Sequence, residues 1–126
     1  IRKLVIKLRG EKGTKALPLE MLILRILSEG DAYGYEISQL IRDYSEDAIT
    51  IAEGAMYPVL YRMVDKGYVS DYKKKVGKRM ERVYYHIEEY GQLTLQELIE
   101  EYRKTVNGVL AVLEHESSNM QGVQNE

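Results

Sequence analysis

The largest concentration of chemically active side chains is a basic segment between Ser70 and Arg82. Six cations stand there against the two acids Asp71 and Glu81; they are Lys73, Lys74, Lys75, Lys78, Arg79 and Arg82. Ammonium and guanidinium groups gathered on one short segment can neutralise phosphates, which gives salt-dependent affinity without sequence choice. A solvated loop kept soluble by its lysines is the alternative interpretation of the same charges.

A second group of side chains, from Glu53 to Lys66, has the spacing of a helix with one exposed face. Its apolar residues recur at the intervals of a buried helical stripe: Met56, Val59, Leu60, Met63 and Val64. Ala55 and Tyr57 lie near the start of the segment, where they could contact base edges or a thymine methyl group. Arg62 and Lys66 lie further along, where contacts to phosphate are favoured.

The sequence lacks the residue patterns that are typical of catalytic or metal-binding sites. His86 and His115 are the two histidines, neither has a carboxylate at metal-ligand spacing beside it, and the chain has no cysteine. A Ser/His/Asp arrangement and a glycine-rich phosphate loop are also missing. The sequence therefore predicts a protein that is not an enzyme and uses neither a metal nor another cofactor.

Three helices are predicted to position the second group. The first begins at Pro18 and ends near Gly30, and it is apolar enough to be central. The second helix is expected over residues 35–44 and the third over 53–66, with Gly67 ending the third in a left-handed conformation. Thr50 or a neighbour is expected to cap the third helix. Two short helices with a short connection have the outline of a helix-turn-helix.

The pattern changes from helical to alternating after Gly67. Residues 31–34 are predicted to be a turn, in which Tyr33 is expected to pack or to donate one phosphate hydrogen bond. Residues 68–73 and 80–87 read as two strands of a hairpin, with Tyr84 and Tyr85 on opposite sides so that only one is in the core. Residues 90–91 are expected to end the hairpin. A hairpin that follows a helix-turn-helix and carries a net positive charge is a wing, and this context favours the phosphate-contacting role.

The last predicted helix, from about Gln92 to Glu116, has an apolar seam with heptad spacing. A single helix at the end of a small domain cannot bury such a seam on itself, so a second copy of the chain is the simplest partner. The residues predicted to make the dimer are Leu95, Leu98, Ile99, Tyr102, Val106, Val109, Leu110 and Leu113.

The two ends of the chain differ in charge. Residues 1–15 hold six cations against one acid, whereas residues 92–126 hold two cations against six acids, within a net charge of −2. The first stretch suits either a helix or a strand; it could contact phosphates or a membrane surface, or be a solubilising leader that packs on a partner subunit. The absence of cysteine, of an export signal and of a membrane-length apolar run predicts a cytoplasmic protein without a membrane partner.

Several short motifs, in order and in register, resemble the PadR family of bacterial transcriptional regulators. They are Leu22-Ile23-Leu24, then Tyr33-Gly34-Tyr35-Glu36-Ile37, then Gly54-Ala55-Met56-Tyr57-Pro58-Val59-Leu60-Tyr61-Arg62-Met63, then Gly67-Tyr68-Val69, and then Arg82-Val83-Tyr84-Tyr85-His86-Ile87 with Gly91. The match covers about residues 17–91, and the single last helix is similar to the short-tailed branch. The resemblance implies a winged helix-turn-helix homodimer that represses promoters, with the last helices forming the dimer.

Two departures from the family pattern stand out. The basic stretch before Leu17 is longer than the usual family start, and the chain has no tryptophan to supply the aromatic residue that some members use in a drug pocket between subunits. Tyr102 lies in the corresponding helix. A pocket lined by Met21, Tyr102 and Val106 is therefore the predicted site for a small aromatic effector.

The sequence thus predicts a mostly α fold with a small β-hairpin, an α+β winged helix-turn-helix with a long C-terminal dimerisation helix. The expected parts are a basic extension (1–16), a DNA-binding domain (17–91), a dimerisation helix (92–116) and a flexible tail (117–126). The expected partners are double-stranded DNA, a second copy of the chain and a small aromatic effector. A winged-helix module that binds proteins and not DNA is the alternative function.

Overall fold

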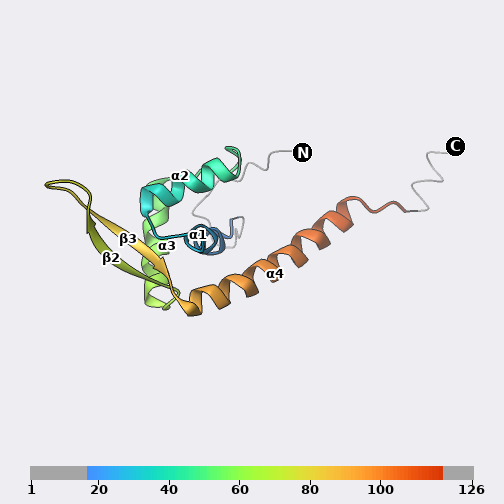
Figure 1. Cartoon of the computed structure of the whole chain (residues 1–126). Helices are drawn as coiled ribbons and strands as arrows, with labels where there is room; N and C mark the ends of the chain where they lie inside the picture. The colour runs from blue at the N-terminus through green and yellow to red at the C-terminus, as the bar shows by residue number, and fades with distance from the viewer. Residues whose placement is uncertain (1–16, 118–126) are drawn as a thin grey trace. The chain divides into compact units, whose positions relative to one another are not determined.

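The computed structural model describes residues 17–117, and these form four helices and a three-stranded antiparallel sheet (Figure 1). The elements in chain order are α1 (Leu19–Leu27), β1 (Ala32–Tyr33), α2 (Gly34–Tyr44), α3 (Glu53–Asp65), β2 (Val69–Lys75), β3 (Glu81–Ile87) and α4 (Glu89–Leu113). The predicted α+β class is confirmed. The chain divides into two compact units after Gln96, inside α4. The predicted basic extension and almost all of the predicted tail lie outside the described residues.

The core of the first unit is made by the apolar sides of α1, α2 and α3, which pack on one another. Its fully buried side chains include Ile23 and Leu24 from α1, Ile37 from α2, and Met56 and Leu60 from α3. Each such side chain contributes about 1.5–3 kcal/mol by leaving water. The buried residues of α3 follow the predicted stripe, so α3 is held by that stripe with its other side available.

The two ends of α3 are built differently. At its start, Ala52 is the capping residue and no side chain accepts from the first turn, so the prediction of a cap from Thr50 or a neighbour is wrong. At its end, Gly67 has a φ of +80°, and the N–H groups of Gly67 and Tyr68 donate to the carbonyls of Val64 and Met63, each at 3.0 Å. This is the glycine-ended motif that the sequence predicted.

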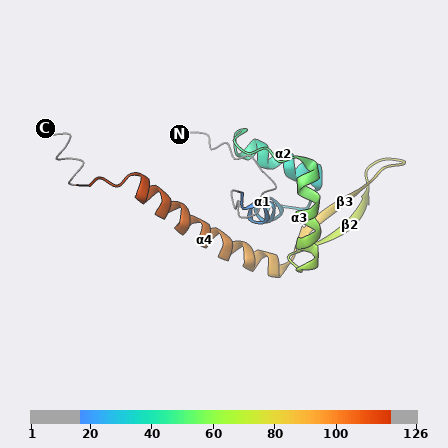
Figure 2. The same ribbon diagram turned by 180° about the vertical axis from the view of Figure 1, so that it is seen from behind.

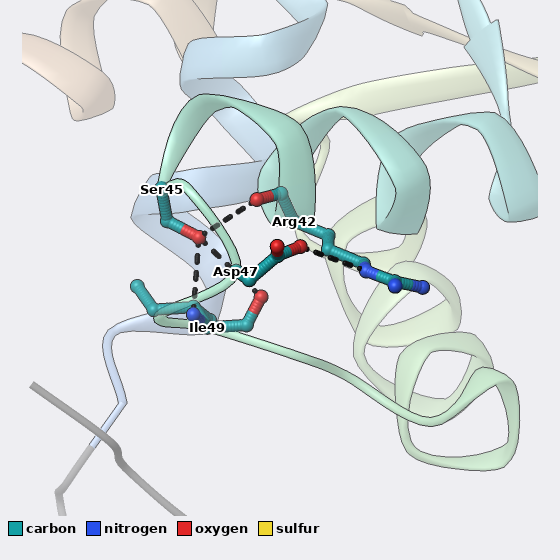
Figure 3. Close-up of polar contacts among 4 residues, drawn as sticks. All are labelled: Arg42, Ser45, Asp47 and Ile49. Atoms are coloured by element: carbon teal, nitrogen blue, oxygen red, sulfur yellow. Dashed lines mark hydrogen bonds and ion pairs between the residues drawn. The ribbon is translucent and has the colours of Figure 1, made fainter. Parts of the chain in front are cut away.

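The end of α2 has the same backbone motif without a glycine. Glu46 and Asp47 have φ of +53° and +67°, a region that most side chains avoid. Local bonds hold the turn: Arg42 Nε donates to Asp47 Oδ1 at 3.1 Å, and Ser45 Oγ accepts from the N–H of Ile49 at 3.0 Å (Figure 3). The connection that leads into α3 is therefore fixed by side-chain bonds.

The sheet has the strand order β1-β3-β2. Ala32 pairs with Tyr85 and Tyr33 with Tyr84, so the prediction of a simple turn over residues 31–34 is wrong. Two residues are too few to show the alternation that marks a strand in a sequence, and only the partner β3 defines β1. Tyr85 is 2% exposed whereas Tyr84 is half-buried, which confirms that one of the two is in the core. Burial raises the pKa of Tyr85 to about 12.

Helix α4 begins earlier than predicted, at Glu89, and ends at Leu113 rather than near Glu116. The expectation that residues 90–91 end the hairpin is wrong, because both lie in the first turn of α4. A side chain at position 91 would collide with the backbone oxygen of Tyr68 and lie 3.0 Å from the Ile87 side chain. Gly91 is therefore present for close packing and not as a helix breaker.

The part of α4 in the second unit, from Glu97 onward, leaves apolar side chains in solvent. Val109, Leu110, Val112 and Leu113 are 44–76% exposed in the single chain. Across residues 17–117, no helix has the combination of length and apolarity needed to cross a membrane.

Candidate nucleic-acid interface

The β2–β3 hairpin projects beyond the three helices of its unit, and its tip carries the predicted basic segment (Figures 1 and 2). The tip is closed by a hydrogen bond of 2.9 Å from the N–H of Val76 to the carbonyl of Met80. Five of the six predicted cations are exposed and Arg82 is half-buried. Within residues 17–117 none of the six forms an ion pair with a carboxylate. Their charges are therefore available to a phosphate backbone.

One face of this hairpin holds a cluster of three tyrosines, Tyr33, Tyr72 and Tyr84. The Tyr84 ring stacks on Tyr72 with centroids 5.8 Å apart and meets Tyr33 edge-on at 5.4 Å. Two of the predicted cations lie over these rings: Arg82 is 4.4 Å from the centroid of Tyr33, and Lys74 is 5.1 Å from that of Tyr84. Cation–π contacts of this kind orient a charged group without neutralising it. Tyr33 therefore has the packing role that the sequence allowed.

Asp31 ties this face together and was not identified from the sequence. Tyr72 donates to its Oδ2 and His86 Nδ1 lies beside its Oδ1, both at 2.7 Å. Burial alone would raise the pKa of Asp31, but the bonds from Tyr72 and His86 and the nearby Lys74 charge lower it. The hydrogen bond to Asp31 raises the pKa of His86. His86 and Asp31 are 55 positions apart, and no local pattern joins them.

On α3, the two residues predicted to contact bases are only half-exposed. Ala55 and Tyr57 are both half-buried. The Tyr57 ring lies where a side chain on Gly34 of α2 would be, 2.8 Å from that position, and its hydroxyl donates to Glu53 Oε2 at 3.3 Å. Burial raises the pKa of Tyr57, so this hydroxyl keeps its proton at neutral pH.

The two cations predicted for the third helix, Arg62 in α3 and Lys66 directly after it, differ in their contacts. Lys66 Nζ lies 3.0 Å from Glu20 Oε2 of α1 and 5.5 Å from the centre of the Tyr68 ring. Arg62 is exposed and forms no ion pair within the described part of the chain. Arg62 is thus the cation of α3 whose charge is free for another partner, and Lys66 would have to share its charge with Glu20.

A surface hollow of about 330 Å³ lies between α3 and the hairpin. Its lining comes from β1, α2, α3, β2 and β3: Tyr33, Gly34, Tyr57, Tyr61, Asp71, Glu81, Arg82, Val83 and Tyr85. The hollow brings together three residues of the predicted DNA site, Tyr33, Tyr57 and Arg82. Tyr61, which was not among the residues predicted for this site, lines the hollow as well.

The predicted dimer interface and the predicted effector pocket were the two other sites, and their residues differ in burial. Leu95 is 3% exposed and belongs to the core of the first unit, so a partner chain has no access to it. Leu98, Ile99, Tyr102 and Val106 are half-buried along α4. Met21, of the predicted effector pocket, is buried in α1. No group of three or more metal-ligating side chains occurs between residues 17 and 117.

Comparison with protein families identifies the family of this chain. Residues 23–97 match the model of the transcriptional regulator PadR-like family. The chain belongs to this family.

Solved PadR-like structures share its winged-helix fold. A PadR-like regulator from Bacillus cereus is 31% identical, with a TM-score of 0.67 and coverage of 78% of this chain and 93% of that one. A PadR family regulator from Clostridium difficile is 31% identical, with a TM-score of 0.66 and coverage of 75% and 97%. Bacillus subtilis PadR, solved in complex with operator DNA, is 22% identical and shares the fold, with a TM-score of 0.60 and coverage of 64% and 46%.

Proposed function

We propose that this PadR-like regulator is a repressor that binds a specific double-stranded DNA operator as a homodimer. The observation that carries the proposal is the projecting hairpin, whose six cations form no salt bridge with a carboxylate of residues 17–117, in the same unit as the exposed side of α3. Bacillus subtilis PadR, which has the same fold, was solved with operator DNA. A promoter-binding repressor of this family would act in the bacterial cytoplasm.

The two parts of the interface have different tasks in this proposal. The exposed side of α3 enters the major groove, where base edges can be distinguished, and Ala55, Tyr57 and Arg62 approach them or the adjacent phosphates. The wing cations contact phosphates or the minor groove and supply salt-dependent affinity. The aromatic rings under Lys74 and Arg82 orient these two cations, and neither cation forms a salt bridge within residues 17–117.

The exposed apolar side chains of α4 support the homodimer. Ile99, Tyr102, Val106, Val109 and Leu113 keep heptad spacing, and Leu98 and Leu110 widen this face. Val109, Leu110 and Leu113 are 44–74% exposed in the single chain, and the other four are half-buried. A symmetric dimer prefers a pseudo-palindrome with half-sites about 34–36 Å apart, one turn of DNA, or a multiple of that spacing.

Release of the operator by a small aromatic effector is also part of the proposal. Thermal unfolding with a panel of phenolic compounds tests it, because a ligand that binds the folded protein raises its Tm. A flat panel would remove the effector from the proposal and leave DNA binding untouched.

Fluorescence polarisation with full-length protein tests the proposed function. A duplex from upstream of the chain's own gene and a scrambled duplex of equal composition are titrated at two salt concentrations. Salt-sensitive binding that prefers the first duplex is the expected result. Equal salt-sensitive binding to both would keep DNA binding and move the operator elsewhere in the genome. No binding to either at low salt would favour the winged-helix module that binds proteins.

A further inference from the structure

The centre of the exposed side of α3 is not where the two predicted base-contacting residues lie. At about 100° per residue, the positions opposite the buried residues of α3 are Gly54, Pro58, Tyr61 and, in the last turn, Asp65. All four are exposed, and Tyr61 is 59% exposed. Ala55 and Tyr57 lie at the two edges of this side and are half-buried.

Two of these four positions, Gly54 and Pro58, have no flexible side chain that extends from the helix. Among residues 17–117, no atom lies within 4 Å of where a Cβ on Gly54 would be, and the backbone there is not left-handed. Neither packing nor conformation explains a glycine that weakens the helix relative to alanine. Pro58 likewise lacks an N–H and has a compact ring. The first turns of α3 are therefore cleared for close approach by something outside this chain.

The two tyrosines of α3 differ in how they are held. Tyr57 is fixed at both ends, with its ring against Gly34 and its hydroxyl on Glu53. The Tyr61 ring packs beside Tyr57, with centroids 6.3 Å apart and an angle of 31° between the planes. No residue in the described part of the chain hydrogen-bonds to the Tyr61 hydroxyl. Tyr61 thus presents a supported ring and an unused hydroxyl at the rim of the hollow.

We propose that Tyr61 is the specificity-determining residue of α3 and that Tyr57 is a positioning residue that supports it. This inference rests on the proposed DNA-binding function. In the major groove the phenolic hydroxyl can donate to guanine O6 or thymine O4, or accept from the amino group of adenine or cytosine. The ring can contact a thymine methyl group. Gly54 and Pro58 allow the helix to come close enough for this contact.

The test first defines a duplex by affinity selection from a random-sequence library with full-length wild-type protein. The selected duplex and its scrambled form are then titrated with Tyr61→Phe and with the matched variant Tyr90→Phe, which removes the hydroxyl of an exposed tyrosine of α4 outside the proposed interface. Tyr61→Phe should bind the selected duplex about tenfold more weakly, the effect of leaving one interfacial polar group unpaired, and the scrambled duplex equally well. Tyr90→Phe should change either affinity less than about twofold.

Single-base variants of the selected duplex then locate the contact. Tyr61→Phe should lose discrimination at one position of each half-site and keep it elsewhere. Unchanged preference at every position would overturn the inference while leaving the proposed function intact. A wild-type protein that enriches no sequence, or binds no duplex at low salt, would overturn the proposed function and this inference with it.

Gly54→Ala tests the clearance independently of the tyrosine hydroxyl. Alanine should raise the Tm, because it favours the helix and meets no neighbour, yet it should weaken binding to both duplexes several-fold. A higher Tm with unchanged affinity would show that α3 does not approach DNA by this side and would overturn the assignment of Tyr61.

Discussion

The two parts of α4 use apolar residues in opposite ways. Near its start, Leu95 is 3% exposed and Gly91 packs against the backbone at Tyr68, so this part belongs to the folded core of the first unit. After Gln96, Val109 is 52% and Leu113 is 74% exposed. The first part stabilises a single chain whatever its concentration. The second would gain burial in the proposed dimer, so its contribution to stability should depend on protein concentration.

The largest expected effect comes from placing charges in the second part. Ile99→Asp with Val106→Asp should weaken the proposed dimer at least about 100-fold, because unpaired carboxylates would be buried at its interface. Sedimentation velocity over a concentration series measures this change. Asn107→Asp with Ala111→Asp adds the same charge on the other side of the helix and should leave the dimer intact. A double variant that stays dimeric would refute the proposed seam.

Substituting one glycine in each part of α4 tests whether the two parts contribute differently to stability. Gly91→Ala should destabilise the fold by about 2 kcal/mol, because the new methyl group collides with backbone at Tyr68. Gly108→Ala should stabilise the helix by about 1 kcal/mol, because no atom of residues 17–117 lies within 4 Å of the added methyl group. Urea unfolding at fixed protein concentration compares the two. Equal effects of either sign would contradict the division of α4.

Charge distinguishes the β2–β3 hairpin from the second part of α4. Lys74→Ala with Lys75→Ala should weaken binding to every duplex and reduce the slope of log K against log salt by about one to two. Arg103→Ala with Lys104→Ala removes two cations from α4 and should leave that slope unchanged. An unchanged slope for the hairpin variant would remove the wing from the DNA contact.

The smallest expected effect concerns the pairing of His86 with Asp31. The pKa of His86 lies above 6.5, so the charged pair stabilises the hairpin fully below that pH and less as pH rises through the folded-state pKa. The lowered pKa of Asp31 preserves the pair until the solution becomes more acidic than the ordinary value of 3.8. NMR titration should show that Asp31→Asn lowers the His86 pKa and that Asp71→Asn does not. Equal shifts would mean that general hairpin charge, and not this contact, sets the pKa.

Local patterns in the sequence predicted the elements that are defined by local physics. The helical stripe of α3 and the left-handed Gly67 were predicted correctly, because spacing and φ preference are properties of neighbouring residues. Strand β1 was missed because only its pairing with β3 defines it. The start of α4 was misplaced because Gly91 was interpreted as a helix breaker, whereas the space it fills is set by Tyr68 and Ile87.

The candidate site was predictable to a similar extent. The hairpin cations were identified from composition alone, and the structure adds which aromatic rings they lie on. The contacts of Asp31 with Tyr72 and His86 join residues far apart in the chain, and no periodicity records them. The half-burial of Tyr57 also escaped the sequence, since it depends on Gly34 of another helix.

Strand β2 is at the outer edge of the described sheet, since the strand order is β1-β3-β2. An edge strand offers unpaired backbone groups to any other strand and can start aggregation. Lys73, Lys74 and Lys75 all lie on β2 and are exposed, so two hairpins that approached edge to edge would bring like charges together. The lysines proposed to contact phosphate therefore also keep copies of the protein from joining into a continuous sheet. Bound DNA would neutralise the charge of these lysines only where it covers them.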